Sequence, residues 1–465
     1  MWLSFDDDNV YVSARCFESN PERMVANELR RDNVITYNNN DAVTFIFDTF
    51  YNRRDGTLFV VTPIGGRFDG QYTNERQYNP DFNPIWDVRT GRFEGGWTFE
   101  AAIPFKTLRY PQEGRQVWGF NLMRNNRWKS EPSSVTLLPP ARGVNAVTQS
   151  SLAATLVGID APARSRNIEI KPYVTGDVTA DRTATPARAN DLGADVGLDV
   201  KFGLSQGMTG DITYNPDFAQ VEADEQHINL TRFSLFFPEK RDFFLENQTL
   251  FTVGTTGTTQ GAGDTPLLFY SRNIGINRFR EVPLSLGGRA TGRVGKWGLG
   301  LLNIQSEDEP AAQAQATNFS VLRVKRDILR RSNIGAIYTG RSMTQAGAGR
   351  NDTVALDGAF SFFTDFTIAT YSARSRTEGR RGRDQSYRGQ LEYTGDRYGV
   401  QVERLVVDPT STRRSGSSAV PTCARASRSS ASALGRSPTE RCGSTRPPPR
   451  GTRSTTPPAS SRRGP

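Results

Sequence analysis

Strict alternation of apolar and polar residues between residues 168 and 406 is the feature that most limits what this chain can fold into. A period of two residues is that of a β-strand, whose side chains point to opposite faces in turn. In residues 191–204, one face carries Leu192, Ala194, Val196, Leu198, Val200, Phe202 and Leu204. The pattern predicts strands near 168–178, 191–204, 206–215, 267–276, 284–294, 297–305, 318–327, 332–340, 353–363, 365–374, 384–395 and 397–406.

The predicted strands have the length and the two-sided character of an antiparallel transmembrane β-barrel. Such strands run about 9–11 residues, with one apolar face and one polar face. A water-soluble sheet with one buried face produces the same alternation. However, a soluble sheet of a dozen strands needs a second layer to cover it, and no apolar helices follow these strands. We therefore predict an all-β chain whose residues 167–407 form a membrane barrel.

Residues 1–150 predict a separate β-sandwich. Short β-branched and aromatic runs alternate there with turn signals, which is typical of sandwiches. The expected strands are 9–17, 41–50, 57–65, 95–105 and 117–126. The stretch that follows is rich in Pro, Ala and Ser, so residues 151–166 are predicted to be a linker.

The segment 215–247 interrupts the barrel pattern, because acidic residues come first and phenylalanines then crowd in. Burial of a Phe side chain contributes roughly 1.5–3 kcal/mol, so a segment this aromatic should pack against something large. We expect it to lie in or beside the barrel lumen as a plug or brace. The residues assigned to this structural motif are Asp217, Glu222, Asp224, Asn229, Arg232, Phe237, Glu239, Lys240, Arg241, Phe244 and Glu246.

Two stretches resemble known families. The strings FDDDNVYVSARCFESNPE and GGWTFEAAIPFKTLRYP look like the family 9 carbohydrate-binding-module-like domain. The string NPDFAQVEADEQHINLTRFSLFFPEKRDFFLEN is close to the hallmark of an uncharacterised domain that follows such modules in Gram-negative outer-membrane proteins. The resemblance implies a β-barrel in the bacterial outer membrane. It also implies an earlier N-terminus with a signal peptide, so we expect the sandwich to be truncated here.

The net charge of +9 comes from the C-terminal tail. Residues 411–465 carry about +10, which leaves the rest of the chain near −1 and gives no indication of nucleic-acid binding. Residues 408–465 are poor in apolar residues and are predicted to be disordered. They are either a basic tail for acidic polymers or the product of a shifted reading frame, in which case the barrel is incomplete.

Catalytic motifs are scarce. With one histidine, His227, and three cysteines, the chain lacks the members of a His-based triad or a His-rich zinc site. Glu222, Asp224, Glu239 and Glu246 could be read as a glycosidase carboxylate pair, but a structural charge network inside the barrel is the simpler interpretation. We therefore assign no catalytic residue.

The sandwich holds candidates for sugar binding, since pyranose rings stack on aromatic side chains while polar groups bind the hydroxyls. The candidate platforms are Trp86, Tyr72 and Trp128, and the candidate polar partners are Arg124, Asn126 and Glu131. Trp97 and Trp118 are expected in the core. Calcium is the one metal considered, at Asp6, Asp8 and Asp48, because it prefers oxygen ligands; no other cofactor is expected.

These features favour a non-catalytic outer-membrane protein that captures or takes up glycans, with polysaccharide or oligosaccharide and membrane lipid as its partners. One alternative is a glycan-degrading hydrolase with an attached binding module. Another is an assembly protein whose sandwich recognises a further protein, of unknown identity.

Overall fold

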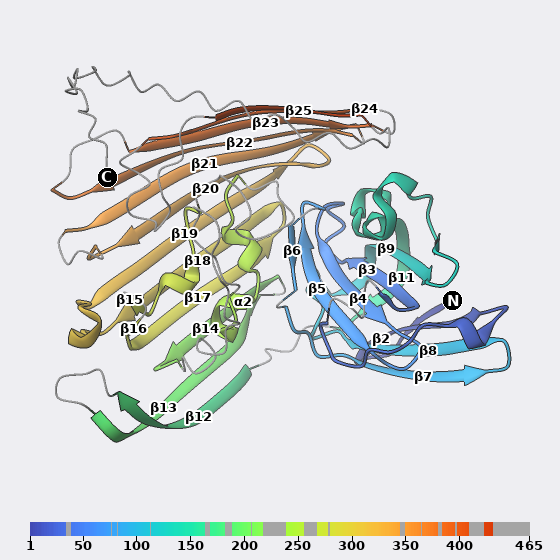
Figure 1. The fold of residues 1–465 in the computed structure, drawn as a ribbon, viewed down its shortest axis with the longest axis horizontal. Coiled ribbons are helices and arrows are strands. Elements are labelled where there is room, and N and C mark those ends of the chain that lie inside the picture. Colours follow the sequence, from blue (N-terminus) through green and yellow to red (C-terminus); the bar gives the residue numbers. More distant parts are fainter. Residues whose placement is uncertain are drawn as a thin grey trace, which may run out of the picture.

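The computed structural model describes residues 1–33, 39–75, 77–80, 82–111, 113–162, 168–181, 188–205, 207–216, 239–254, 267–277, 280–344, 349–363, 365–379, 384–395, 398–408 and 423–430. Within these residues the chain is all-β, as predicted. A two-layered sandwich lies against one end of a large curved sheet (Figure 1). No helix in the described part of the chain is both long enough and apolar enough to span a bilayer.

The sandwich consists of two antiparallel sheets. The smaller sheet has the order β1 (Trp2–Phe5), β2 (Asn9–Phe17), β8 (Gly96–Pro104) and β7 (Asp87–Phe93). The larger sheet has the order β10 (Glu131–Ser134), β9 (Gly114–Asn126), β3 (Ala42–Asp48), β4 (Gly56–Val61), β5 (Arg67–Thr73) and β6 (Gln77–Asn79), and β11 (Ala154–Ala161) also pairs with β9. A short 3-10 turn, η1 (Pro21–Arg23), follows β2.

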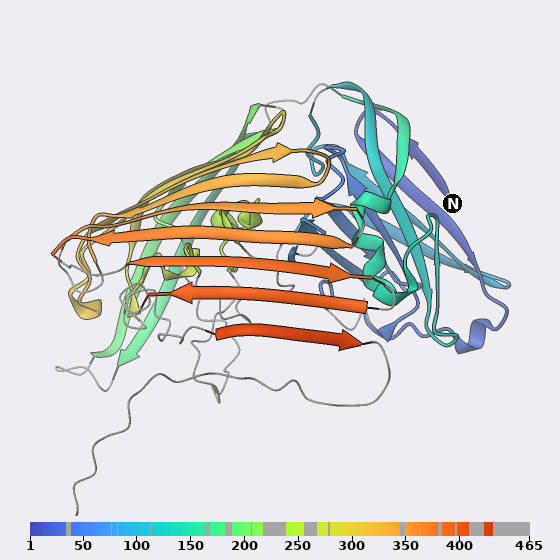
Figure 2. The ribbon, with the colours of Figure 1, turned by 90° about the horizontal axis from the view of Figure 1, so that it is seen from above.

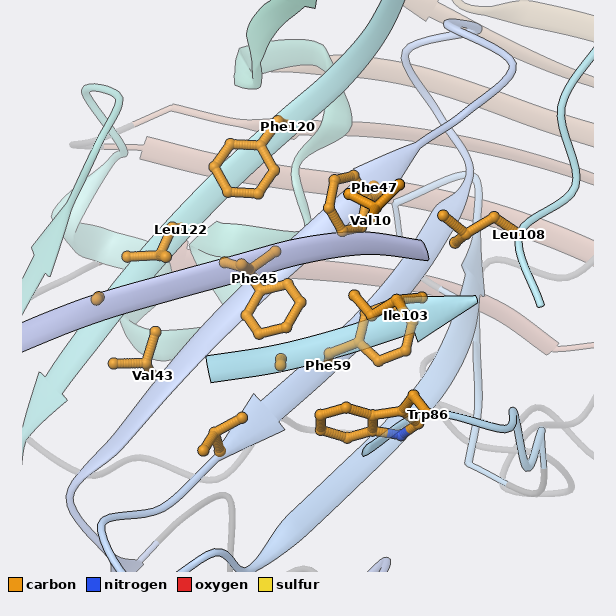
Figure 3. Close-up of a cluster of buried hydrophobic side chains, with 14 of the residues drawn as sticks. Val10, Val43, Phe45, Phe47, Phe59, Trp86, Ile103, Leu108, Phe120 and Leu122 are labelled. Atoms are coloured by element: carbon orange, nitrogen blue, oxygen red, sulfur yellow. The ribbon is translucent and has the colours of Figure 1, made fainter. Parts of the chain in front are cut away.

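The core between the two sheets is aromatic (Figure 3). Phe45 stacks on Phe59 at 5.4 Å between ring centroids, and Phe47 meets Trp118 edge-on at 5.9 Å. Trp97 and Trp118 are fully buried, as predicted. Every residue of β3 is buried because η2 (Pro140–Thr148) and η3 (Ser150–Leu152) cover the second face of its sheet.

The sandwich extends further along the chain than the sequence predicts. β11 pairs with β9 from Ala154↔Phe120 to Ala161↔Gly114, so residues that were assigned to a linker form a strand. The predicted linker of residues 151–166 therefore begins too early. Its last part, residues 163–166, lies outside the described residues.

Within the described residues, the large sheet has twelve antiparallel strands, each paired with its neighbour in chain order. They are β12 (Ile168–Asp181), β13 (Arg188–Ser205), β14 (Met208–Tyr214), β17 (Leu284–Val294), β18 (Trp297–Ser306), β19 (Thr317–Ile328), β20 (Ser332–Arg341), β21 (Asn351–Phe362), β22 (Phe366–Thr377), β23 (Gln385–Thr394), β24 (Tyr398–Val407) and β25 (Cys423–Ser430).

Two differences from the predicted strands stand out. Residues 267–276 do not join the sheet: they form η5 (Ser271–Asn273) and lead into the two-stranded hairpin of β15 (Ile276–Asn277) and β16 (Arg280–Glu281). The twelfth strand is β25, which lies within the predicted disordered tail of residues 408–465 and pairs with β24. Apart from Asp408, the remaining tail residues lie outside the described part.

The sheet curves into a trough, and the segment Glu239–Gly254 lies on its concave side (Figure 2). This segment contains α2 (Asp242–Leu245) and η4 (Gln248–Phe251). A further 3-10 turn, η6 (Pro310–Ala312), lies in the loop between β18 and β19. The first and last strands of the sheet, β12 and β25, do not pair with each other, so the twelve described strands form an open wall.

Candidate functional site: the concave wall and its joint with the sandwich

The two faces of the large sheet differ in character, and the concave face carries buried polar side chains beside one apolar patch. Large apolar side chains on its convex face are exposed, whereas charged and hydroxyl side chains on its concave face are buried. On β21, the buried Thr353 and Ala355 alternate with the exposed Val354 and Leu356. Buried polar residues on the concave face are Thr209, Asp211, Thr213, Arg289, Thr291, Arg323, Thr353, Ser386, Arg388 and Gln390.

An apolar cluster holds the inner segment Glu239–Gly254 against the wall. Phe243, Phe244, Phe251 and Val253 of the segment are buried. Their partners on the wall include Leu302, Ile304, Val321, Ile337 and Tyr371. Gly300 makes this contact close, because a Cβ there would lie 2.9 Å from the Phe251 ring. Packing of this kind accounts for the crowded aromatics in the sequence motif.

Arginines on the wall bind the backbone of the same segment. Arg289 Nη1 donates to the carbonyl oxygen of Phe243 at 2.7 Å. Arg323, which is fully buried, donates to the carbonyls of Leu250 at 3.0 Å and Thr252 at 3.1 Å. Arg388 Nη1 donates to the carbonyl of Gly254 at 2.9 Å. These bonds satisfy carbonyl groups of an irregular backbone that would otherwise be buried without partners.

The guanidinium of Arg323 has its own counter-ion. It forms a two-pronged pair with Asp357 on β21, at 2.6 Å to Oδ1 and 2.8 Å to Oδ2. Planar pairing of this kind is a property of arginine that lysine does not share. The wall and the inner segment are therefore joined by one hydrogen-bonded network as well as by apolar contacts.

The motif residues Glu239 and Arg241 form a buried pair inside the trough. Arg241 donates to both carboxylate oxygens of Glu239 at 2.8 Å, and also to the carbonyls of Ile274 and Ser271. Its guanidinium lies 4.3 Å from the centre of the Phe244 ring. Lys240 is half-buried beside them, and its backbone N–H donates to Glu239.

Glu246 connects the wall to the sandwich. It accepts from Arg109 of the sandwich at 2.6 Å, from Lys201 of β13 at 2.9 Å, and from the Thr209 hydroxyl at 3.2 Å. Burial alone would raise the pKa of Glu246, but the charges and hydrogen bonds of Arg109 and Lys201 outweigh it and lower the pKa below its usual range. A glycosidase general acid needs the opposite shift, so this carboxylate is suited to holding the parts together.

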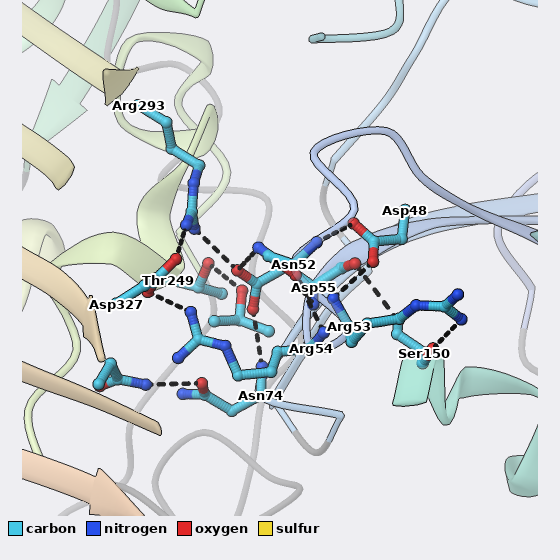
Figure 4. Close-up of polar contacts among 12 residues, drawn as sticks. Asp48, Asn52, Arg53, Arg54, Asp55, Asn74, Ser150, Thr249, Arg293 and Asp327 are labelled. Carbon is cyan, nitrogen blue, oxygen red and sulfur yellow. Dashed lines mark hydrogen bonds and ion pairs between the residues drawn. The ribbon is translucent and has the colours of Figure 1, made fainter. Parts of the chain in front are cut away.

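An ionic network joins the sandwich directly to the rim of the wall (Figure 4). Asp327 at the end of β19 pairs with Arg54 of the sandwich and with Arg293 of β17. Arg293 also pairs with Asp55 of the sandwich at 3.0 Å.

Further contacts extend the same joint. Arg331 on the rim pairs with Glu75 at 2.7 Å, and Asn333 donates to Asn74 at 3.1 Å. The hydroxyl groups of Thr73 and Thr249 lie 2.8 Å apart and connect the sandwich to the inner segment.

A cavity of about 120 Å³ lies within this joint. Its lining combines three sources: the sandwich turns around Asp48–Thr57 and Thr73–Asn74, the inner segment at Asn247–Leu250, and the wall at Arg293, Lys325 and Asp327. Sequence reasoning did not identify Arg54, Arg293 or Asp327, because nothing in their local pattern indicates that they meet. The alternation does place Asp357 and Arg388 on the polar face.

The structure corrects the prediction of sugar platforms at Trp86 and Tyr72. Trp86 is 4% exposed, packs edge-on against Phe59 and donates its Nε1–H to Asp69 at 2.9 Å. Tyr72 is 2% exposed, and its hydroxyl lies 2.8 Å from that of Ser150. Neither ring offers a face on which a sugar could stack, because both complete the packing of the sandwich.

Of the other four predicted sugar-binding residues, Asn126 is buried and the remaining three are at least partly exposed. Trp128 is half-buried, with Arg23 and Lys129 over its ring at 5.4 and 5.0 Å. Arg124 and Asn126 both bind Glu18, a buried carboxylate that the sequence did not single out. Glu131 is exposed on β10, opposite Asn126 in the register.

The three aspartates considered for calcium do not come together as a site. Asp6 caps a turn by accepting from the backbone N–H groups of Asp8 and Asn9 and from the Tyr11 hydroxyl. Asp48 is buried and accepts from the backbone N–H groups of Asn52 and Arg53. Among the described residues, no three His, Cys, Asp or Glu side chains cluster closely enough to hold a metal ion.

Part of the predicted motif lies outside the described residues: Asp217, Glu222, Asp224, Asn229, Arg232 and Phe237. The described members are Glu239, Lys240, Arg241, Phe244 and Glu246, all of which belong to the inner segment or its contacts.

One known family model matches part of this chain, mainly within the large sheet. The model of a domain of unknown function, DUF5916, matches residues 165–322, which run from the start of the wall to β19. The match does not reach the sandwich, so the resemblance of residues 1–150 to a carbohydrate-binding module remains a prediction. No curated protein matches the chain.

Three solved structures are weakly similar to the chain. OmpF of Salmonella typhi in complex with daunomycin has a TM-score of 0.28 at 10% identity, over 79% of this chain and 90% of that one. The outer-membrane channel DcaP of Acinetobacter baumannii has a TM-score of 0.26 at 8% identity, over 78% and 89%. An anion-selective porin from Comamonas acidovorans has a TM-score of 0.26 at 11% identity, over 84% and 93%. Scores this low support no inference about this chain.

Proposed function

We propose that the chain is an outer-membrane protein whose large sheet is the wall of a β-barrel, with an apolar face toward lipid and a polar face toward the lumen. The contrast between the two faces of the sheet is the observation that carries this proposal. Soluble monomers rarely expose apolar patches larger than a few hundred Å². Here the exposed apolar side chains run from Ile168 on β12 to Val402 on β24, across nearly the whole sheet.

The lengths of the connections support an orientation in the membrane. The sandwich contacts the end of the wall where β17–β18, β19–β20 and β21–β22 are joined by turns of two or three residues. At the opposite end the connections are longer: ten residues separate β18 from β19 in the chain, nine separate β20 from β21, and seven separate β22 from β23. Outer-membrane barrels have short periplasmic turns and longer extracellular loops. We therefore place the sandwich on the periplasmic side, where it covers one end of the wall.

This arrangement suits the controlled passage of a hydrophilic solute. A polar lumen would admit such a solute, while the inner segment and the docked sandwich both restrict the path through it. Uptake of a glycan is the specific form that the sequence resemblance suggests. Trp128, the one predicted platform that is half-exposed, is where we place sugar contact by the sandwich.

Membrane insertion can be tested by flotation. The purified chain, refolded from denaturant in the presence of liposomes, should float with them through a density gradient and resist extraction by carbonate. Folded and heated samples should also migrate differently on a denaturing gel. Recovery of a compact, soluble particle without detergent that does not float would contradict the proposal.

Sugar contact needs a separate test. Glycan-array binding by the full chain in detergent should weaken when Trp128 is replaced by Ala, whereas replacement of the exposed Leu137 should have no effect. Binding that is unchanged in Trp128→Ala, or no binding to any glycan, would remove the glycan from the proposal and leave the barrel intact.

A further inference from the structure

The cavity at the joint between sandwich and wall has more cationic groups than carboxylates to pair with them. Arg54, Arg293 and Lys325 line it together with the carboxylates of Asp55 and Asp327. A fourth cation in the lining, Arg109, is already paired with Glu246. Three cations therefore lie beside these two carboxylates, and the lining holds one more carboxylate, Asp48.

The two carboxylates are fully engaged. Asp327 uses one oxygen for Arg54 and the other for Arg293. Asp55 accepts from Arg293 and from the Asn52 amide through one oxygen, and from the backbone N–H of Asn74 through the other. Little accepting capacity is left for further donors.

Three donors in the cavity lack such an acceptor. Among the residues that the structure describes, nothing accepts a hydrogen bond from Nη1 of the buried Arg54 or from Nε of the half-buried Arg293. Within the described part of the chain, no carboxylate lies at ion-pair distance from the Lys325 ammonium. Buried donors normally have an acceptor, so the two guanidinium nitrogens indicate a missing acceptor, and the half-buried Lys325 adds a positive charge beside them.

A further carboxylate in the lining, Asp48, offsets this excess only in part. It is held by two backbone N–H groups, and burial raises the pKa of Asp48 to about 7, so near neutral pH a large fraction of it carries no charge. The cavity volume of about 120 Å³ is well above the roughly 10–15 Å³ needed to admit one water molecule. That is enough room for one small oxyanion.

We propose that this cavity binds a small oxyanion, either phosphate or a carboxylate, which Arg54, Arg293 and Lys325 hold between the sandwich and the wall. The anion supplies the missing acceptors and fastens the two parts of the molecule to each other. The inference goes beyond the proposed transport function and does not depend on it, since the joint exists whether or not the convex face meets lipid.

The test uses the full chain in detergent micelles. The thermal unfolding midpoint is measured against rising phosphate, sulfate or acetate, with chloride at equal ionic strength as the reference. At least one oxyanion should raise the midpoint in a saturable way that chloride does not reproduce. Comparison of the phosphate and acetate series shows which chemistry the site prefers. A rise that merely follows ionic strength for every salt would overturn the proposal.

Substitutions of the lining residues test whether the oxyanion binds in this cavity. Lys325→Met removes one cation without touching the Asp327 pairs and should weaken the apparent affinity about tenfold or more. Arg54→Lys keeps a cation for Asp327 but removes the free Nη1, and should weaken binding as well. Lys296→Met, at an exposed position in the nearby β17–β18 turn, is the matched control and should bind as the parent does. Equal affinity in the parent, Lys325→Met and Arg54→Lys would overturn the proposal.

Discussion

At the scale of single residues, arginine joins the parts of this molecule. Arg289, Arg323 and Arg388 each reach from a strand of the wall to a backbone carbonyl of the inner segment. Arg54 and Arg293 meet at Asp327 across the joint with the sandwich. A guanidinium can serve several acceptors at once, because its five N–H donors lie in one rigid plane. That geometry suits an irregular segment whose carbonyls have no strand partner.

Replacement of Arg323 by Met should destabilise the folded chain by about 3–5 kcal/mol, because Asp357 would be left as a buried charge without its partner. Urea unfolding in detergent measures the loss. The double variant Arg323→Met/Asp357→Leu should recover part of it, since no unpaired charge then remains. A single variant as stable as the parent would show that the pair does not hold the wall to the inner segment.

The pH dependence of stability should report on Asp48. Burial raises the pKa of Asp48 from 3.8 to about 7 in the folded chain, so the folded state binds a proton more tightly than the unfolded state does. The loss of unfolding free energy caused by ionising Asp48 is therefore absent below about pH 4, grows between pH 4 and 7, and is complete above pH 7.

The variant Asp48→Asn should lose this dependence. Between pH 4 and 7 the unfolding free energy of the variant should fall by less than that of the parent, and the difference should be on the order of a few kcal/mol. The variant also loses one backbone hydrogen bond, which lowers its stability by a constant amount at every pH. The exposed Asp7→Asn is the control and should follow the parent. Parallel curves for Asp48→Asn and the parent would contradict the account of this carboxyl.

At the scale of strands, local sequence predicts most of the wall, because the side-chain period is a property of neighbouring residues. Eleven of the predicted strands lie within a few residues of those observed. The stretch 267–276 fails because its apolar residues serve another purpose: Leu268 and Phe269 pack on the inner cluster. β11 is missed because Pro-rich and Ala-rich flanks hide a short strand that pairs with β9.

Substitution of a convex-face residue by arginine tests whether that face contacts lipid or water. Leu356 is 62% exposed on β21, and Val157 is 66% exposed on β11 of the sandwich. If lipid covers the sheet, Leu356→Arg should cost about 2–4 kcal/mol in vesicles, near the bilayer midplane. Val157→Arg should cost less than about 0.5 kcal/mol, because that position faces water. Equal, small effects at both positions would mean that the convex face is also in water.

At the scale of the whole molecule, the joint could not be predicted from sequence. Arg54 and Asp327 are 273 residues apart, and Thr73 and Thr249 are 176 apart. No periodicity or motif spans such separations, and only the folded chain brings these groups together. For the same reason the sequence predicts sugar platforms at Trp86 and Tyr72: it shows that the residue is aromatic but not that its ring is buried.

A disulfide should form across the joint when Thr73 and Thr249 are both replaced by Cys, because their hydroxyl oxygens are 2.8 Å apart. The background would carry Cys423→Ser and Cys442→Ser, with the buried Cys16 retained. Mild oxidation should give a faster band on a non-reducing gel. The control pair, Thr73→Cys with Thr370→Cys on the convex face, should not cross-link. Failure of the first pair in folded protein would contradict the docked position of the sandwich.

The membrane assignment can be measured most directly along β21. Single cysteines at Thr353, Val354, Ala355 and Leu356 would carry an environment-sensitive fluorophore, in vesicles whose acyl chains bear a quencher. If lipid covers the convex face, quenching should have a period of two residues: strong at Val354 and Leu356, weak at Thr353 and Ala355. Water-like emission without quenching at Val354 and Leu356 would contradict the membrane assignment.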